Sequence, residues 1–271
     1  FEANSRIEAY TILAILLGIG GGVAIAAVTS VMVSSSICLL LFAASIAMTF
    51  YIPMQRGNRH IKIRKETRLF FENFRLLYGH PTTHYALIGT GAFWMSSAVL
   101  RIAVLAWIPL ALGFAENDFR VSLILATTSI GIIGGAFFAP KVIPLSRFTK
   151  AILYGFLMTG CIMLFPWIHS TFIAILMLLG VGFMGGVFIV PMNTVIQEQG
   201  LQIIGSGKTI AVQNFVENSL MLGGTVIYYA VSDMGGSVSF AILFQGILLV
   251  VFLGYLVFKI PEVDRARTKR I

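Results

Sequence analysis

The sequence predicts an all-α integral membrane protein with about eight transmembrane helices, and three observations support this prediction. Hydrophobic residues make up 58% of the 271-residue chain, whereas charged residues make up only 11%. A soluble domain usually carries about 25% charged residues, because its exterior has to be polar. The apolar residues form runs long enough to cross a bilayer, and the basic residues lie between these runs.

Eight apolar stretches reach the length of roughly 20 residues that a helix needs to cross a hydrocarbon core about 30 Å thick. They are 11–29, 31–54, 84–112, 121–140, 151–168, 171–196, 209–231 and 237–258. The strands of a membrane β-barrel would be about 10 residues long and would alternate polar with apolar positions. Because the eight stretches are longer and apolar on all sides, they are predicted to be helices.

The basic residues predict the orientation of the chain. If residues 1–10 are cytoplasmic, the other cytoplasmic segments are 55–83, 141–150, 197–208 and 259–271. Of the 19 Lys and Arg residues, all except Arg101 and Arg120 lie in these five segments. Such an asymmetry follows the positive-inside rule, so both ends are predicted to be cytoplasmic. The formal charge of +8 is thereby assigned to membrane loops, and no nucleic-acid partner is expected.

The longest loop, 55–83, divides the chain into two spans before it and six after it. Apolar residues recur within it at helical spacing, namely Leu69, Phe70, Phe74, Leu77 and Tyr78. This pattern predicts an amphipathic helix along the cytoplasmic lipid surface. Both a plain linker between two bundles and a specific lipid- or partner-binding role remain open for it.

Glycines cluster inside several predicted helices. Two such clusters are Gly131, Gly134 and Gly135, and Gly180, Gly182, Gly185 and Gly186. Small residues let helix backbones approach closely in a bilayer, where lipid provides no hydrophobic drive for helix association. Tight structural packing and a moving interface are both compatible with these clusters.

Arg101 and Glu217 are the only formally charged side chains within the eight stretches. Counting residues from the ends of their helices places both at middle depths of the bilayer. A charge at that depth costs several kcal/mol unless it is paired or hydrated. The two side chains are therefore expected either to form a buried ion pair or to face a shared aqueous cavity.

Amide side chains accompany Glu217. Gln213, Asn214, Glu217 and Asn218 are predicted to share one face of their helix. Asn193, near the end of the preceding span, adds a second polar patch. Such groups are hard to accommodate in lipid, so the sequence predicts a polar cavity in the bundle interior.

The arrangements that an enzyme needs are missing from the sequence. The four histidines lie in predicted loops or at the ends of spans, and no nucleophile triad or metal-ligand spacing appears. No metal and no cofactor are expected. A transporter is therefore favoured over an enzyme.

Three motifs are distinctive: WIPLALG at 107–113, VPMN at 190–193 followed by Gln197-Glu198, and AVQN at 211–214 followed by Glu217-Asn218. In these motifs the chain resembles the bacterial lysophospholipid transporter (LplT-type) family of the major facilitator superfamily. The loop 141–150 departs from the wider superfamily, because its usual acidic and basic signature is reduced to three basic residues.

The resemblance implies a twelve-helix plan in which this chain supplies helices five to twelve. Residues 1–54 would be the last two helices of the N-terminal bundle, and 55–83 the basic cytoplasmic linker. Residues 84–258 would be the complete six-helix C-terminal bundle, and 259–271 a basic cytoplasmic tail.

The implied function is inward flipping of lysophospholipids, such as lysophosphatidylethanolamine, across the bacterial inner membrane by alternating access. An acyltransferase–acyl carrier protein synthetase, either cytosolic or fused, would then reacylate them. Arg101 is expected to bind the phosphate, and Glu217 to balance Arg101 or to meet an ammonium headgroup. The amides of Asn193, Gln213, Asn214 and Asn218 would line the cavity.

Two alternatives remain open. The chain could be part of a proton-coupled efflux transporter for drugs or metabolites, with Glu217 as the proton carrier. It could also be the membrane anchor of a fused acyltransferase protein.

Overall fold

The structure is a computed structural model that describes residues 29–51, 62–115 and 119–268, together with single residues between 14 and 25. The first predicted span, 11–29, lies almost entirely outside the described residues. The chain forms two compact units, Phe1–Thr67 and Arg68–Ile271. They are described one at a time.

The described residues are helical and contain no strand, which confirms the all-α membrane class. Among them, six helices are long and apolar enough to cross a membrane. Their apolar segments are Met32–Thr49, Pro81–Leu112, Arg120–Val142, Leu145–Trp167, Thr171–Ile203 and Val238–Ala266. The chain is therefore a multi-pass membrane protein.

The first unit contains α2 (Val31–Thr49). Ser30 caps this helix, because its hydroxyl oxygen accepts a hydrogen bond from the backbone N–H of Val33 at 3.4 Å. The large hydrophobic side chains of α2 are exposed, as expected for a helix whose solvent is lipid.

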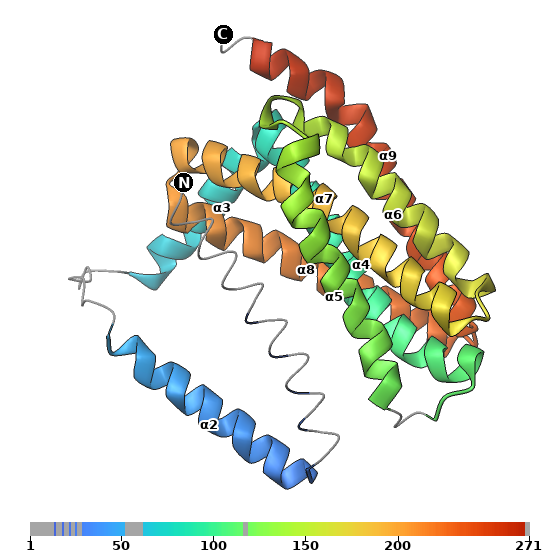
Figure 1. The fold of residues 1–271 in the computed structure, drawn as a ribbon. Coiled ribbons are helices and arrows are strands. Elements are labelled where there is room, and N and C mark those ends of the chain that lie inside the picture. The colour runs from blue at the N-terminus through green and yellow to red at the C-terminus, as the bar shows by residue number, and fades with distance from the viewer. Residues whose placement is uncertain are drawn as a thin grey trace. The chain divides into compact units, whose positions relative to one another are not determined.

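The second unit begins within α3 and continues through a bundle of six long helices (Figure 1). Its elements are α3 (Ile63–Gly79), α4 (Pro81–Leu112), α5 (Phe119–Val142), η1 (Leu145–Ala151), α6 (Ile152–Leu164), η2 (Phe165–Trp167), α7 (Thr171–Ile203), α8 (Ser206–Asp233) and α9 (Val238–Thr268). Helix α4 packs against α7, α8 and α9, while α7 also packs against α5 and α6.

Local sequence signals explain several helix ends. Pro81 occupies the first turn of α4, where its missing N–H is not needed. Gly113 closes the same helix in the left-handed conformation, with φ of 71°. Gly205, with φ of 89°, separates α7 from α8.

Two helices continue well beyond their predicted C-terminal ends. Helix α7 continues to Ile203 and α9 to Thr268, so much of the predicted loop 197–208 and of the predicted tail 259–271 is helical. The predicted ends were wrong because the apolar pattern marks only the part of a helix in hydrocarbon, and a helix can continue beyond it.

Helices α5 and α7 touch through their backbones. A Cβ atom at Gly135 would overlap the carbonyl oxygen of Phe183, and one at Gly182 would overlap that of Thr128. Gly131 and Gly186 are equally close to carbonyl oxygens of the opposite helix. This close approach supports the tight-packing interpretation of the glycine clusters.

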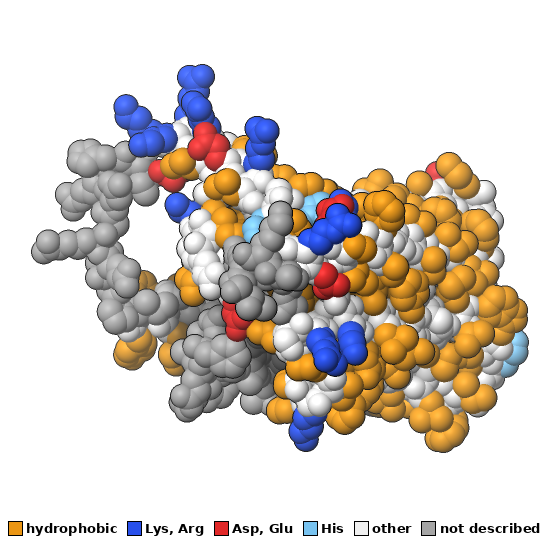
Figure 2. Space-filling model, turned by 90° about the horizontal axis from the view of Figure 1, so that it is seen from above, with side chains coloured by type: hydrophobic (Ala, Val, Ile, Leu, Met, Phe, Trp, Pro, Cys, Tyr) orange, Lys and Arg blue, Asp and Glu red, His pale blue; other side chains and the backbone are white. Residues whose placement is uncertain are grey.

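Charged and hydrophobic side chains occupy different parts of the surface. In Figure 2 the right-hand part of the visible face is mostly hydrophobic and shows no Lys or Arg side chain. A membrane protein requires this segregation, because basic residues belong at the interface and apolar ones in the hydrocarbon.

Candidate substrate-binding site

A buried polar cluster joins α4, α7 and α8. Its centre is Gln213, whose Nε2 donates to Asn193 Oδ1 at 2.9 Å and to Glu217 Oε1 at 2.8 Å. Gln213 and Glu217 are each 8% exposed. The Thr90 hydroxyl of α4 lies within reach of the Glu217 carboxyl group. We call these four residues the buried polar cluster.

Close contact between α4 and α8 brings the cluster together. A Cβ atom at Gly91 of α4 would overlap the side chain of Leu220, and one at Gly224 of α8 would overlap that of Met95. Polar groups inside a membrane protein must find partners within the protein, because lipid offers none. Gln213 meets this demand because its amide donates hydrogen bonds to Asn193 of α7 and to Glu217 of α8.

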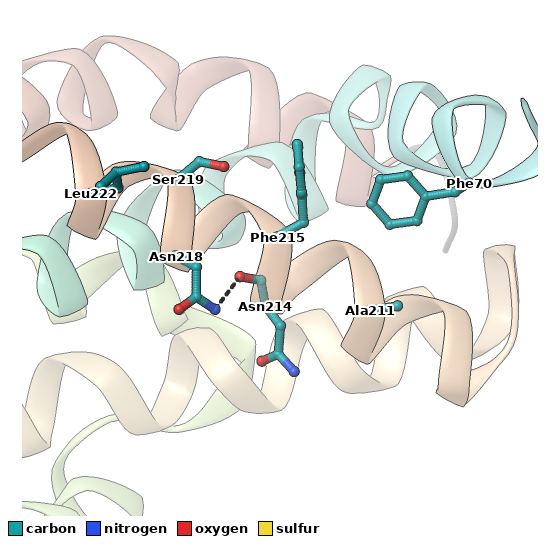
Figure 3. A pocket seen from close by; sticks show the side chains of 7 residues that line it. All are labelled: Phe70, Ala211, Asn214, Phe215, Asn218, Ser219 and Leu222. Carbon is teal, nitrogen blue, oxygen red and sulfur yellow. Dashed lines mark hydrogen bonds between the residues drawn. The ribbon is translucent and has the colours of Figure 1, made fainter. Parts of the chain in front are cut away.

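Asn214 and Asn218 lie on a different side of α8. Both are exposed, and Asn218 Nδ2 donates to the backbone oxygen of Asn214 at 2.7 Å (Figure 3). The prediction that all four polar residues share one face was therefore wrong. Neighbouring residues on a helix are about 100° apart, so Gln213 and Glu217 turn inward while Asn214 and Asn218 do not.

The two exposed asparagines line a surface pocket of about 420 Å³. The other lining residues are Phe70, Ala211, Phe215, Ser219 and Leu222. In Figure 3, Phe70 comes from α3, and the remaining side chains project from α8. The lining thus combines an apolar surface with two amides and one hydroxyl, and the volume lies within the range of small-molecule sites.

Arg101 lies apart from the buried polar cluster. It is exposed on α4, eleven residues beyond Thr90, which corresponds to about 16 Å along the helix. Among the described residues, no ion pair or hydrogen bond joins Arg101 to Glu217. The ion-pair alternative is therefore not realised, because the two charges occupy different levels of the bundle.

Sequence reasoning missed Thr90 and the aromatic residues of the pocket. Threonine is common in membrane helices, where its hydroxyl usually bonds a carbonyl one turn earlier, as Thr90 does with Leu87 at 3.2 Å. Phe70 and Phe215 looked like ordinary apolar positions. The only signal for Thr90 is its place in the segment Leu87-Ile88-Gly89-Thr90, which also resembles the LplT-type family.

Comparisons with known proteins support the resemblance noted in the sequence. No protein-family model matches the chain. It is 35% identical, over 241 residues, to proteins named lysophospholipid transporter LplT from Yersinia pestis (strain Pestoides F), Yersinia pestis bv. Antiqua (strain Angola) and Yersinia pseudotuberculosis serotype O:3 (strain YPIII).

Each of these alignments covers 88% of this chain and 59% of the relative, so the chain spans little more than half the length of the curated relatives it matches. The aligned part nevertheless includes most of the helical bundle. Over nearly all of its own length, the chain is therefore similar to proteins named lysophospholipid transporter LplT.

Proposed function

We propose that this protein is a secondary transporter, not an enzyme, and that it flips lysophospholipids across the bacterial inner membrane by alternating access. The similarity to proteins named lysophospholipid transporter LplT and the chemistry of the α8 surface support this proposal. An acyltransferase–acyl carrier protein synthetase that consumes the flipped lipid is proposed as its functional partner.

The observation that carries the proposal is the exposed pair Asn214 and Asn218 beside an apolar pocket on α8, a helix that is predicted from the sequence to span the membrane. An amide facing hydrocarbon lacks partners and costs several kcal/mol, so this surface is better suited to water and a polar ligand group. A lysophospholipid has a polar headgroup and one acyl chain. It therefore matches a surface that is polar and apolar side by side.

Arg101 is proposed as the phosphate-binding residue. Its exposed guanidinium can offer charge-assisted hydrogen bonds to phosphate oxygens. Glu217 is instead assigned to positioning, because it is buried and already accepts from Gln213. In this arrangement Glu217 and Asn193 hold the Gln213 amide in place, while the exposed amides contact the substrate.

The test is flipping of fluorescent lysophosphatidylethanolamine by the full-length protein in proteoliposomes. Arg101→Gln should lower the flipping rate about tenfold or more, the usual effect of losing a hydrogen bond to a charged group. Arg147→Gln, which removes an exposed arginine from η1, is the matched control. Normal flipping by Arg101→Gln would remove this residue from the substrate site.

Glu217 also favours a second candidate function. A buried carboxyl group on a helix predicted to span the membrane is the group that a proton-coupled carrier needs. Proton-coupled efflux of drugs or metabolites therefore remains the alternative proposal. Proton movement driven by a cationic drug in proteoliposomes, lost in Glu217→Gln, would favour efflux over lipid flipping.

We further propose that the basic segments face the cytoplasm. The distribution of Lys and Arg supports this orientation. In a variant without native cysteines, Lys150→Cys should resist a membrane-impermeant maleimide added outside spheroplasts and react after lysis. Reaction in intact spheroplasts would reverse the proposed orientation.

A further inference from the structure

Helix α3 uses only one of its faces for packing. The rings of Phe70 and Phe74 meet Phe215 of α8 edge to face, with centroid distances of 5.3 and 6.0 Å. Leu77, on the same side, is fully buried. The apolar face is thus occupied within the protein.

A basic stripe runs along another side of α3. Arg68 and Arg75 are seven residues apart, so they lie nearly in line along the helix. Both are exposed, and 83% of the Arg68 side chain is accessible even though its Nε donates to Glu72 at 2.9 Å. A solvent-exposed pair of this kind contributes little to stability, so it does not explain the stripe.

Exposed apolar side chains flank the stripe. Phe71 is 55% exposed on one side of it, and Leu76 is 56% exposed on the other. The Phe71 ring also meets Phe215 edge to face, with centroids 6.5 Å apart, so part of this ring packs within the protein and the rest is exposed. Arginine heads beside exposed apolar side chains are typical of helices that lie in the interface plane of a membrane.

The position of α3 in the chain places this face near the lipid headgroups. The helix ends at Gly79, and the membrane helix α4 begins at Pro81. Because α4 enters the bilayer directly after α3, the C-terminal end of α3 lies near the boundary between headgroups and acyl chains.

We propose that this face of α3, made of Arg68, Arg75, Phe71 and Leu76, binds anionic phospholipid headgroups of the surrounding bilayer. The guanidinium groups donate charge-assisted hydrogen bonds to phosphate oxygens. Phe71 and Leu76 enter the adjoining acyl region. Free phosphate would leave the exposed parts of Phe71 and Leu76 in contact with water, whereas a lipid would cover them, so the proposed occupant is a lipid.

The experiment is hydrogen–deuterium exchange of the full-length protein in nanodiscs of phosphatidylcholine, with and without phosphatidylglycerol. Phosphatidylglycerol should slow exchange in α3. Arginine near an anionic surface contributes roughly fivefold to affinity, so the double variant R68Q/R75Q should bind about 25-fold more weakly and lose this protection. Salt near 1 M should have the same effect in the wild type, because it shortens the screening length to about 3 Å.

The matched control is R147Q/K150Q, which removes the same charge from the exposed surface of η1. It should keep the lipid-dependent protection. Phe71→Ser, which changes no charge, should reduce the protection in part. The proposal is overturned if the two double variants behave alike, if phosphatidylglycerol leaves α3 unchanged in the wild type, or if inorganic phosphate alone reproduces the protection.

Discussion

Replacing Gly135 by alanine tests the packing of α5 against α7. The new Cβ atom would overlap the carbonyl oxygen of Phe183, a backbone atom that cannot rotate away. The helices would have to separate along their whole contact. Overpacking of this kind costs roughly 1–3 kcal/mol, and a backbone clash belongs at the upper end of that range.

The gain in helix propensity partly offsets this cost. Alanine is more favourable than glycine in a helix interior by about 1 kcal/mol. Gly135→Ala should therefore lower the free energy of unfolding by about 2 kcal/mol. The neighbouring variant Gly134→Ala is the control, because its Cβ atom would meet only the Phe183 ring at 3.6 Å, an ordinary contact.

The measurement is reversible unfolding of the full-length protein in mixed micelles of mild detergent and dodecyl sulfate, followed by circular dichroism. Gly135→Ala should unfold at a lower dodecyl sulfate fraction than wild type, whereas Gly134→Ala should match or exceed it. If the two variants unfold together, the backbones of α5 and α7 are not in contact and the reasoning fails.

Three further predictions concern polar side chains. Gln213→Leu should lower the free energy of unfolding by about 1–3 kcal/mol in the same unfolding assay, because it leaves Glu217 without its donor; wild-type stability would contradict the hydrogen bond. Asn218→Ala should leave stability within about 0.5 kcal/mol, as for exposed positions, yet slow lysophospholipid flipping severalfold; unchanged flipping would exclude a substrate contact. His84→Phe should lower the free energy of unfolding by about 1–3 kcal/mol, because the His84 ring loses its 2.7 Å hydrogen bond to the Tyr255 hydroxyl. Tyr255→Phe should lower it by a similar amount. If the losses of the two single variants add up in the double variant, the two side chains are not hydrogen-bonded to each other.

The helices were predictable because hydrophobic run length is a direct physical requirement of the bilayer. The ends of the helices were less predictable. Helix α9 continues through Lys259, where a 2.7 Å bond to Glu262 links side chains three residues apart at the polar end of the helix. Hydropathy does not register such local contacts, so it ends the helix where the apolar residues end.

The candidate site was predictable in composition but not in arrangement. Residue type alone singled out Gln213 and Glu217, since polar groups in an apolar helix need an explanation. Their pairing with Asn193 depends on how α7 meets α8. The level of Arg101 relative to Glu217 depends on the axial offset between α4 and α8, which the fit of Gly91 against Leu220 determines and residue counting does not.

The contact between α5 and α7 has a mechanical consequence. The glycines of each helix lie directly against carbonyl oxygens of the other helix. Neither helix can therefore slide along the other unless the two first move apart. In any rearrangement of the bundle, α5 and α7 should therefore move together as one rigid body. Spin labels placed one on each of these helices should keep a constant separation through the proposed transport cycle, while labels on other helix pairs report the motion.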